Sequence, residues 1–263
     1  MPTTPRSDQE IENVFGDGVS DAARILPAGS LREEGRRLWA FLRQPTLHSN
    51  VTVGKPSTVL ARIYAFDMAA MLTLIMAASL VVAMGVSLPQ TALAGIEFTP
   101  LIVIGVILLA PVSEEIIFRS WISGKPAQVF ALLLGVMGAG AVFSFYDRAP
   151  LISGTVAFGA VLAAFAVLIL LRNRPTLGWF NRQFPVFFWL STVAFALVHV
   201  TNFEVASDWS NLVMILPLVL PQFILGALLG YIRVRIGLWA AIVLHAGHNA
   251  TAIGISALAM AFE

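Results

Sequence analysis

The sequence predicts an all-α fold: a polytopic integral membrane bundle of about seven (seven or eight) transmembrane helices, with its N-terminus inside and its C-terminus outside. Three observations predict it. Of 263 residues, 58% are hydrophobic and 12% are charged, whereas soluble domains carry about 25% charged residues. Apolar runs follow one another from Arg62 to the C-terminus, each about long enough to cross a hydrocarbon core of about 30 Å. The basic residues gather on one side of the predicted bundle.

The predicted spans are the apolar segments between charged or turn-rich breaks. They cover residues 63–87, 99–122, 127–146, 151–171, 184–201, 211–232 and 237–260. If the N-terminus is cytoplasmic, the inner segments hold every Lys and Arg except Arg148, which is 15 of the 16. The outer loops carry Asp147, Glu204 and Asp208. This division of charge predicts the N-in, C-out orientation.

Residues 1–60 are predicted to form a cytoplasmic tail, and residues 61–263 a transmembrane domain. The first 30 residues are rich in Pro, Ser, Asp and Gly and are expected to be flexible. No apolar stretch follows a basic start, so no cleavable signal peptide is expected. Residues 31–43, LREEGRRLWAFLR, can form a helix with one apolar and one basic side. Such a segment lies either on the inner leaflet or in solvent before the first span.

Two adjacent carboxylates interrupt the second predicted span, LIVIGVILLAPVSEEIIFRSWI. A charged residue at the centre of a spanning helix costs about 2.5–3.5 kcal/mol on insertion scales, so such residues tend to be functional. Glu115 and Arg119 are spaced i, i+4 and can pair, while Glu114 points about 100° away. We therefore expect Arg119 to keep Glu115 ionised, and Glu114 to be the general base. The alternative is a helix end at the inner interface.

Three of the four histidines lie in or near apolar runs, and two of them are candidates for the same site. His245 and Asn249 are spaced i, i+4 and share a helical face, about 15 Å from Arg235. Glu114 lies at a similar depth, about 16 Å from Lys125. His199 ends the run FFWLSTVAFALVH, about 25 Å from Arg182 if its helix is straight. His199 therefore reaches the other groups only if its helix begins near Pro185, tilts, or has its first turn in the interface. His248 is expected to be a packing residue or a neighbour of the site.

These groups suit hydrolysis of a substrate by an activated water molecule. The chain has no cysteine, which excludes disulfides, thiolate nucleophiles and Cys-based metal sites. Glu114 and His199 would deprotonate the water, and His245 with Asn249 would donate hydrogen bonds to the tetrahedral oxyanion. The alternative is a zinc site with Glu114, His199 and His245 as candidate ligands. The residues do not decide between no required cofactor and zinc.

Together, three motifs form a family pattern. They are EExxxR at Glu114–Arg119, FxxxH at Phe195–His199 and HxxxN at His245–Asn249. In this order, over roughly residues 100–260, the chain resembles the CAAX prenyl protease and bacteriocin-processing family of intramembrane endopeptidases. The resemblance implies a helical membrane fold and glutamate-dependent, water-mediated peptide cleavage. It implies these roles: Glu114 as base, His199 as its partner on the water, His245 and Asn249 as oxyanion donors, Glu115 with Arg119 as the supporting pair.

The chain departs from this pattern in two ways. Many relatives have Gly after the arginine, where this chain has Ser120, and many have a shorter stretch between the first two motifs. Here about 75 residues intervene, including a predicted hairpin over residues 127–171. Because two extra spans preserve orientation, the insertion is compatible with the same site.

The predicted function is therefore an intramembrane endopeptidase in the bacterial inner membrane. Its expected partners are the lipid bilayer and a membrane-associated protein or peptide substrate, with no nucleic acid. One alternative is a non-proteolytic scaffold or immunity-type protein of the same fold, but a scaffold needs neither a base nor oxyanion donors. The other is a proton-coupled transporter, which is disfavoured because the sequence shows no internal repeat.

Overall fold

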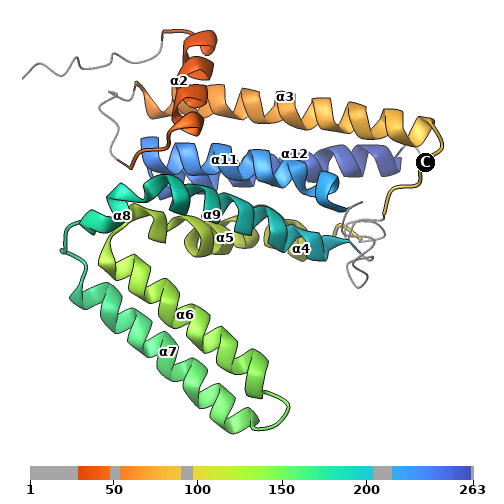
Figure 1. The fold of residues 1–263 in the computed structure, drawn as a ribbon. Helices are drawn as coiled ribbons and strands as arrows, with labels where there is room; N and C mark the ends of the chain where they lie inside the picture. Colours follow the sequence, from red (N-terminus) through yellow and green to blue (C-terminus); the bar gives the residue numbers. More distant parts are fainter. Residues whose placement is uncertain (1–28, 48–53, 90–96, 204–214, 262–263) are drawn as a thin grey trace, which may run out of the picture.

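The computed structural model describes residues 29–47, 54–89, 97–203 and 215–261, and over these residues its regular structure is entirely helical (Figure 1). Seven helices are long and apolar enough to cross a membrane, which confirms the predicted count. They cover Pro56–Ala83, Pro100–Ser123, Pro126–Phe145, Pro150–Leu170, Phe184–Asn202, Leu216–Arg235 and Leu238–Met260.

Several of these spans consist of more than one element. The helices are α2 (Leu31–Arg43), α3 (Pro56–Ala83), α4 (Pro100–Ile104), α5 (Ala110–Arg119), α6 (Pro126–Phe145), α7 (Pro150–Leu170), α8 (Gly178–Arg182), α9 (Phe184–Val198), α11 (Leu220–Arg235) and α12 (Leu238–Ala261). A π-helical turn, η1 (Gly105–Leu109), joins α4 to α5, and short 3₁₀ turns are η2 (Trp121–Ser123), η3 (His199–Asn202) and η4 (Leu216–Val219).

The first span begins earlier than predicted. A proline is favoured in the first turn of a helix, where its missing N–H is not needed, and α3 begins at Pro56 rather than near residue 63. Arg62, which precedes the first predicted span, therefore lies in α3. Its guanidinium donates to the Gly29 carbonyl at 3.2 Å and lies 3.8 Å from the Glu34 carboxylate. A basic residue thus anchors the start of a span instead of marking its boundary.

The amphipathic segment forms α2 and packs onto the bundle. Its N-cap is Ser30, whose hydroxyl accepts from the Glu33 N–H, a favoured capping arrangement. Glu34 is 1% exposed and accepts a 2.7 Å hydrogen bond from the Tyr231 hydroxyl of α11. Phe41 packs edge-on against the ring of Tyr231. One face of α2 is therefore buried against protein, while Trp39 on another face is 64% exposed.

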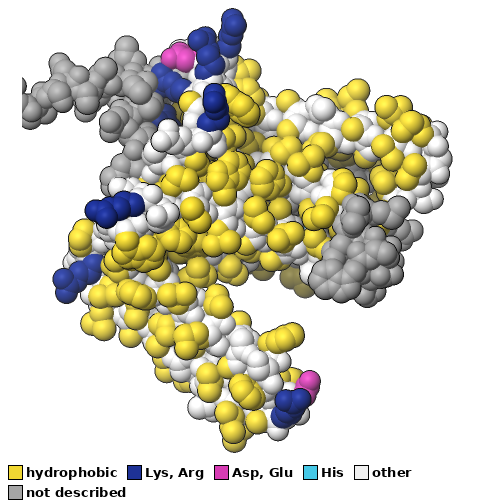
Figure 2. All heavy atoms as spheres, in the orientation of Figure 1, with side chains coloured by type: hydrophobic (Ala, Val, Ile, Leu, Met, Phe, Trp, Pro, Cys, Tyr) yellow, Lys and Arg dark blue, Asp and Glu magenta, His cyan; other side chains and the backbone are white. Residues whose placement is uncertain are grey.

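The remaining helices form a main body and a separate hairpin (Figure 1). α11 contacts α3, α9 and α12, and α5 contacts both α9 and α12. α6 and α7 pack against each other along their length and diverge from the body, with α6 held at η2. Figure 2 shows Lys and Arg side chains at the α2 and α8 end and at the hairpin tip. The N-in orientation remains a prediction from this charge distribution.

A tight turn at Gly124 fixes the point where the hairpin leaves the body. Its φ of +66° lies in the left-handed region, where glycine is favoured. An added Cβ would lie 2.7 Å from the Phe180 ring, so the backbone there passes directly against α8. The Leu177 N–H donates to the Gly124 carbonyl at 2.9 Å. The hairpin therefore starts at a turn that packs directly against α8.

Candidate active site

Glu114 lies at the point where α5, α9 and α12 meet. Its Oε2 atom is 3.8 Å from Nε2 of His199 and 3.8 Å from Nε2 of His245. Among the described residues, this buried oxygen has no hydrogen-bond partner. The Glu114 side chain is nevertheless 27% exposed, compared with 17% for His199 and 2% for His245. Of the three side chains, that of Glu114 is the most exposed, although its Oε2 atom is buried.

The two histidines present the same ring nitrogen to Glu114. His199 Nδ1 lies 2.7 Å from the Phe195 carbonyl, and His245 Nδ1 lies 3.1 Å from a Glu115 carboxylate oxygen. Because a carbonyl or an ionised carboxylate only accepts, each Nδ1–H is the donor. In the neutral rings both Nε2 atoms then carry lone pairs directed toward Glu114. These acceptors face one point, and a water molecule placed there can donate to two of them, such as Glu114 and His199.

Glu115 and Arg119 form a buried ion pair behind His245. The guanidinium donates to the Glu115 carboxylate at 3.1 Å, and the side chains are 0% and 1% exposed. Arg119 also donates to the Gly226 carbonyl of α11 at 3.4 Å. Since the same Glu115 oxygen accepts from both Arg119 and His245, the pair holds the His245 ring in one tautomer. The i, i+4 spacing indicated the pairing of Glu115 with Arg119. The structure adds that the pair orients the His245 ring.

Phe195, the phenylalanine of the FxxxH motif, packs against the charged and imidazole side chains of the site. Its ring is fully buried, and the Arg119 guanidinium lies 3.9 Å from the ring centroid, close enough for a cation–π contact. The ring centroids of His199 and His245 lie 4.7 Å and 5.6 Å away. One aromatic side chain therefore supports both histidines and the buried arginine.

His199 reaches Glu114 despite its greater predicted depth. The Ser191 hydroxyl donates to the Phe118 carbonyl, so α9 and α5 are in register there, and they run antiparallel (Figure 1). Side chains on a helix lean toward its N-terminus. Glu114 and His199 therefore lean toward each other from two antiparallel helices, which closes the gap that a straight-helix estimate leaves between them.

Asn249 shares a helix face with His245, as predicted, but its observed contact is with η1. Its amide donates to the Val106 carbonyl at 2.8 Å. π-helical turns occur frequently at functional sites, and here the turn supplies a carbonyl to the last helix. An asparagine amide has two N–H groups, so one donor remains for a substrate oxygen. The structure does not itself assign that role.

A second polar pair lies on another face of α12, and we did not anticipate it. His248 Nδ1 lies 2.8 Å from the Asp67 carboxylate of α3, and Asp67 is 2% exposed. His248, expected to be a packing residue or site neighbour, thus binds a buried acid. The signal was available in the sequence, because Asp67 is a lone carboxylate within an apolar run. Its partner lies 181 residues away, beyond the reach of any local pattern.

The donor types around Glu114 are chemically suitable for zinc, since a carboxylate and two imidazole nitrogens are common ligands. Among the described residues, however, no group of three or more His, Cys, Asp or Glu side chains is arranged to hold a metal ion. Ligand atoms bonded to one tetrahedral ion at about 2.0–2.2 Å lie about 3.3–3.6 Å apart, slightly closer together than the 3.8 Å separations here. We therefore derive no chemical step through a metal.

Comparison with known proteins identifies the family. A model described as "Type II CAAX prenyl endopeptidase Rce1-like" matches residues 96–251, more than half of the chain. The match contains α5, α9 and the part of α12 that carries His245 and Asn249. No curated protein and no solved structure matches the chain. The chain belongs to the Rce1-like family of type II CAAX prenyl endopeptidases, a family of membrane proteases.

Proposed function

We propose that this protein is an intramembrane endopeptidase that hydrolyses a peptide bond of a membrane-associated protein or peptide with a water molecule activated by Glu114. The observation that carries the proposal is the unpartnered Glu114 oxygen 3.8 Å from two imidazole nitrogens. Each gap is too long for a direct hydrogen bond, and a bridging water satisfies such a contact.

In the first step, the water donates one hydrogen bond to Glu114 and the other to His199 Nε2. As the water oxygen attacks the scissile carbonyl carbon, its proton passes to the Glu114 carboxylate, which acts as general base. The C–O bond forms and the carbonyl becomes a tetrahedral oxyanion. The protonated Glu114 then gives its proton to the leaving nitrogen when the C–N bond breaks.

To serve as an oxyanion donor, His245 must already be an imidazolium before the water attacks, because the proton that the water releases goes to Glu114. Its Nδ1–H is committed to Glu115, so Nε2 donates only when the ring is an imidazolium. The buried Glu115 carboxylate compensates that positive charge, and Asn249 supplies the second donor through its remaining N–H. Such fixed donors are most effective in a water-poor site.

A cleavage assay tests the base assignment. Purified protein in lipid nanodiscs is mixed with membrane-tethered peptides, including C-terminally prenylated ones as the family's name suggests. Glu114→Gln should lower kcat about 10²–10⁴-fold, the usual contribution of general-base catalysis. Glu97→Gln makes the same chemical change at a carboxylate that none of the site contacts involves, and should leave kcat unchanged. Full activity in Glu114→Gln would contradict the proposal.

A further inference from the structure

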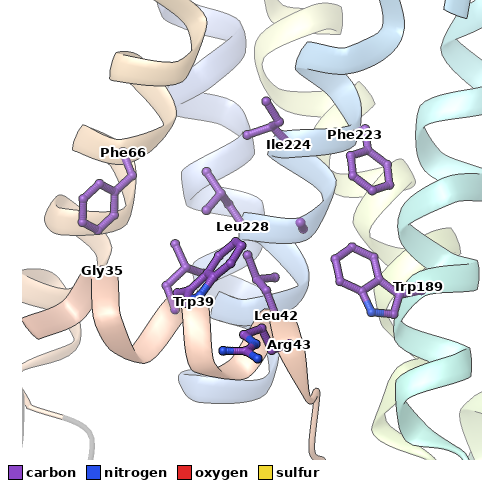
Figure 3. Close-up of a pocket in the computed structure, with 11 residues that line it drawn as sticks. Gly35, Trp39, Leu42, Arg43, Phe66, Trp189, Phe223, Ile224 and Leu228 are labelled. Atoms are coloured by element: carbon purple, nitrogen blue, oxygen red, sulfur yellow. The ribbon is translucent and has the colours of Figure 1, made fainter.

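A second functional feature is an apolar cavity between α2 and the spans α3, α9 and α11 (Figure 3). Its volume is about 610 Å³, within the range of about 300–1,000 Å³ that is typical of small-molecule sites. Aromatic side chains form much of its wall: Trp39, Phe66, Trp189 and Phe223. None of the candidate catalytic residues lines it. The cavity is therefore separate from the site at Glu114.

The cavity has one charged residue at its lining, and that residue lies at one end. Arg43 is the last residue of α2 and is exposed. Within the described ranges no carboxylate lies in salt-bridge contact with it. Figure 3 shows Arg43 at the α2 end, and Phe223 and Ile224 at the opposite end. The occupant that fits is a long apolar chain with an anionic group at one end.

The depth of the cavity agrees with this shape. Phe66 lies ten residues after Pro56, the start of α3, and therefore about 15 Å along that helix. Trp39 lies on α2 itself (Figure 3), and tryptophan is favoured at the level of lipid headgroups. The cavity thus runs from the predicted headgroup level into the predicted hydrocarbon layer.

The positive charge on α2 favours a lipid with an anionic headgroup. Arg32 and Arg36 are exposed on the same helix as Arg43, and Figure 2 shows basic side chains grouped there. Basic clusters beside transmembrane helices attract anionic lipids. We propose that the cavity binds one acyl chain of an anionic glycerophospholipid, whose phosphate group contacts Arg43.

This site uses a part of the chain that the family match does not include. α2 and Phe66 precede residue 96, where the match begins, whereas Trp189 and Phe223 fall inside it. The wall of the cavity also adjoins the catalytic support, because Ala227 lines the cavity and the preceding Gly226 accepts from Arg119. A bound chain would pack against the turn of α11 that holds this arginine.

Brominated lipids test the proposal on the full chain. Nanodiscs of phosphatidylcholine receive a minor fraction of phosphatidylglycerol with a dibrominated acyl chain, and tryptophan fluorescence is measured. Brominated phosphatidylglycerol should quench more strongly than brominated phosphatidylcholine at the same fraction. The excess should disappear in a variant with Trp39→Phe and Trp189→Phe, because these are the tryptophans that line the cavity.

Two matched pairs of variants locate the headgroup and the chain. Arg43→Gln should weaken the apparent affinity for phosphatidylglycerol about fivefold, whereas Arg36→Gln, the same change outside the cavity, should weaken it by about twofold or less because of ionic screening. Ala227→Leu fills the cavity and should remove the excess quenching, whereas Ala166→Leu on the exposed side of α7 should not.

Equal quenching by the two lipids, or equal effects of Arg43→Gln and Arg36→Gln, would overturn the proposal. Displacement of brominated phosphatidylglycerol by a C-terminally lipidated peptide would also overturn it, since the cavity would then hold a substrate chain. The readout needs no peptidase activity, so a failure here is distinct from a failure of the proposed catalytic function.

Discussion

The main body and the α6–α7 hairpin are both highly apolar, yet only the body contains spans whose most apolar windows are buried to a large share. Half of the most apolar window of Leu216–Arg235 is buried, and 39% of that of Phe184–Asn202. In the hairpin the corresponding shares are 11% and 6%. Two other spans of the body, Pro56–Ala83 at 6% and Pro100–Ser123 at 11%, are as little buried as the hairpin. The hairpin spans contain no charged residue and no histidine. The body, in contrast, encloses Glu115, Arg119 and His245 almost completely.

The comparison shows that hydropathy alone does not distinguish a span that faces lipid from one that surrounds a site. Helices in a membrane gain little from apolar contact with each other, because lipid is equally apolar. The body is instead held by polar contacts and close aromatic packing, such as Arg119 to Gly226 and Glu34 to Tyr231. The hairpin relies on close approach at small residues: a Cβ on Gly138 would lie 2.9 Å from that of Ala160.

The largest expected difference between the two regions is the cost of removing an arginine. Arg119→Met leaves Glu115 buried without its cation and should lower the free energy of unfolding by about 3–5 kcal/mol. Arg148→Met, at the exposed hairpin tip, should change it by no more than about 0.5 kcal/mol. Unfolding in mixed detergent micelles measures both. Similar losses in the two variants would show that the body is not held by its buried pair.

A glycine substitution in the body and one in the hairpin should lower stability alike but differ in their effect on cleavage. Gly230→Ala would place a Cβ 2.6 Å from the Phe188 ring, and Gly138→Ala would place one 2.9 Å from the Ala160 Cβ. Each overpacked contact should lower the free energy of unfolding by about 1–3 kcal/mol. Cleavage should decrease only for Gly230→Ala, since its helix carries the carbonyl that holds Arg119. An equal loss of cleavage in Gly138→Ala would place the hairpin within the catalytic machinery.

The pair Asp67–His248 tests whether polar contacts hold the body beyond the candidate site. Asp67→Asn keeps the side-chain shape but removes a charged hydrogen-bond acceptor, which should lower the free energy of unfolding by about 1.5–3 kcal/mol. Asp147→Asn makes the same change at the exposed hairpin tip and should have an effect near zero. Thermal unfolding in nanodiscs compares them, and an unchanged midpoint in Asp67→Asn would refute a structural role for the pair.

The smallest expected effect is a pH dependence at α2. The Gly29 N–H donates to Glu33 at 2.7 Å and, with Arg37, holds the pKa of this carboxyl below its ordinary value of 4.5. Because the folded-state pKa is depressed, the stabilisation is present above the unfolded pKa and is lost as pH falls through the folded one. Hydrogen-exchange protection of α2, corrected for intrinsic rates, should fall in acid.

Glu33→Gln is the variant that checks this cause. The protection of α2 should then vary less with pH below about pH 4, while the hairpin spans, which contain no carboxylate, should show no such dependence in either protein. The same acid dependence of α2 in the wild type and in Glu33→Gln would mean that another group titrates there.

The sequence predicted the hairpin well, because each of its spans is a continuous apolar run between turn signals. Predicted spans at residues 127–146 and 151–171 differ by one residue at each end from α6 (Pro126–Phe145) and α7 (Pro150–Leu170). The predicted start of the first span, residue 63, was wrong, because we treated Arg62 as the boundary of the span. A basic side chain in the first turns of a span can extend to a polar partner, here Glu34.

The candidate site was predictable as a set of residue types, but its geometry was not. Spacing along one helix indicated the Glu115–Arg119 pair and the shared face of His245 and Asn249. It could not show that Glu115 contacts His245, or that Asn249 donates to Val106. Such contacts depend on the register between helices, which no local pattern specifies. Residues 211–214 of the sixth predicted span lie outside the described residues.

We propose that Glu114 activates water without a metal ion, and cleavage by metal-free protein tests this proposal most directly. Wild-type protein is treated with a strong chelator and freed of metal, and single-turnover cleavage of a membrane-tethered peptide is measured beside Glu114→Gln. The account predicts full cleavage by the chelated wild type and a loss of about 10²–10⁴-fold in the variant. Loss of wild-type cleavage on chelation, with recovery on addition of zinc, would contradict it.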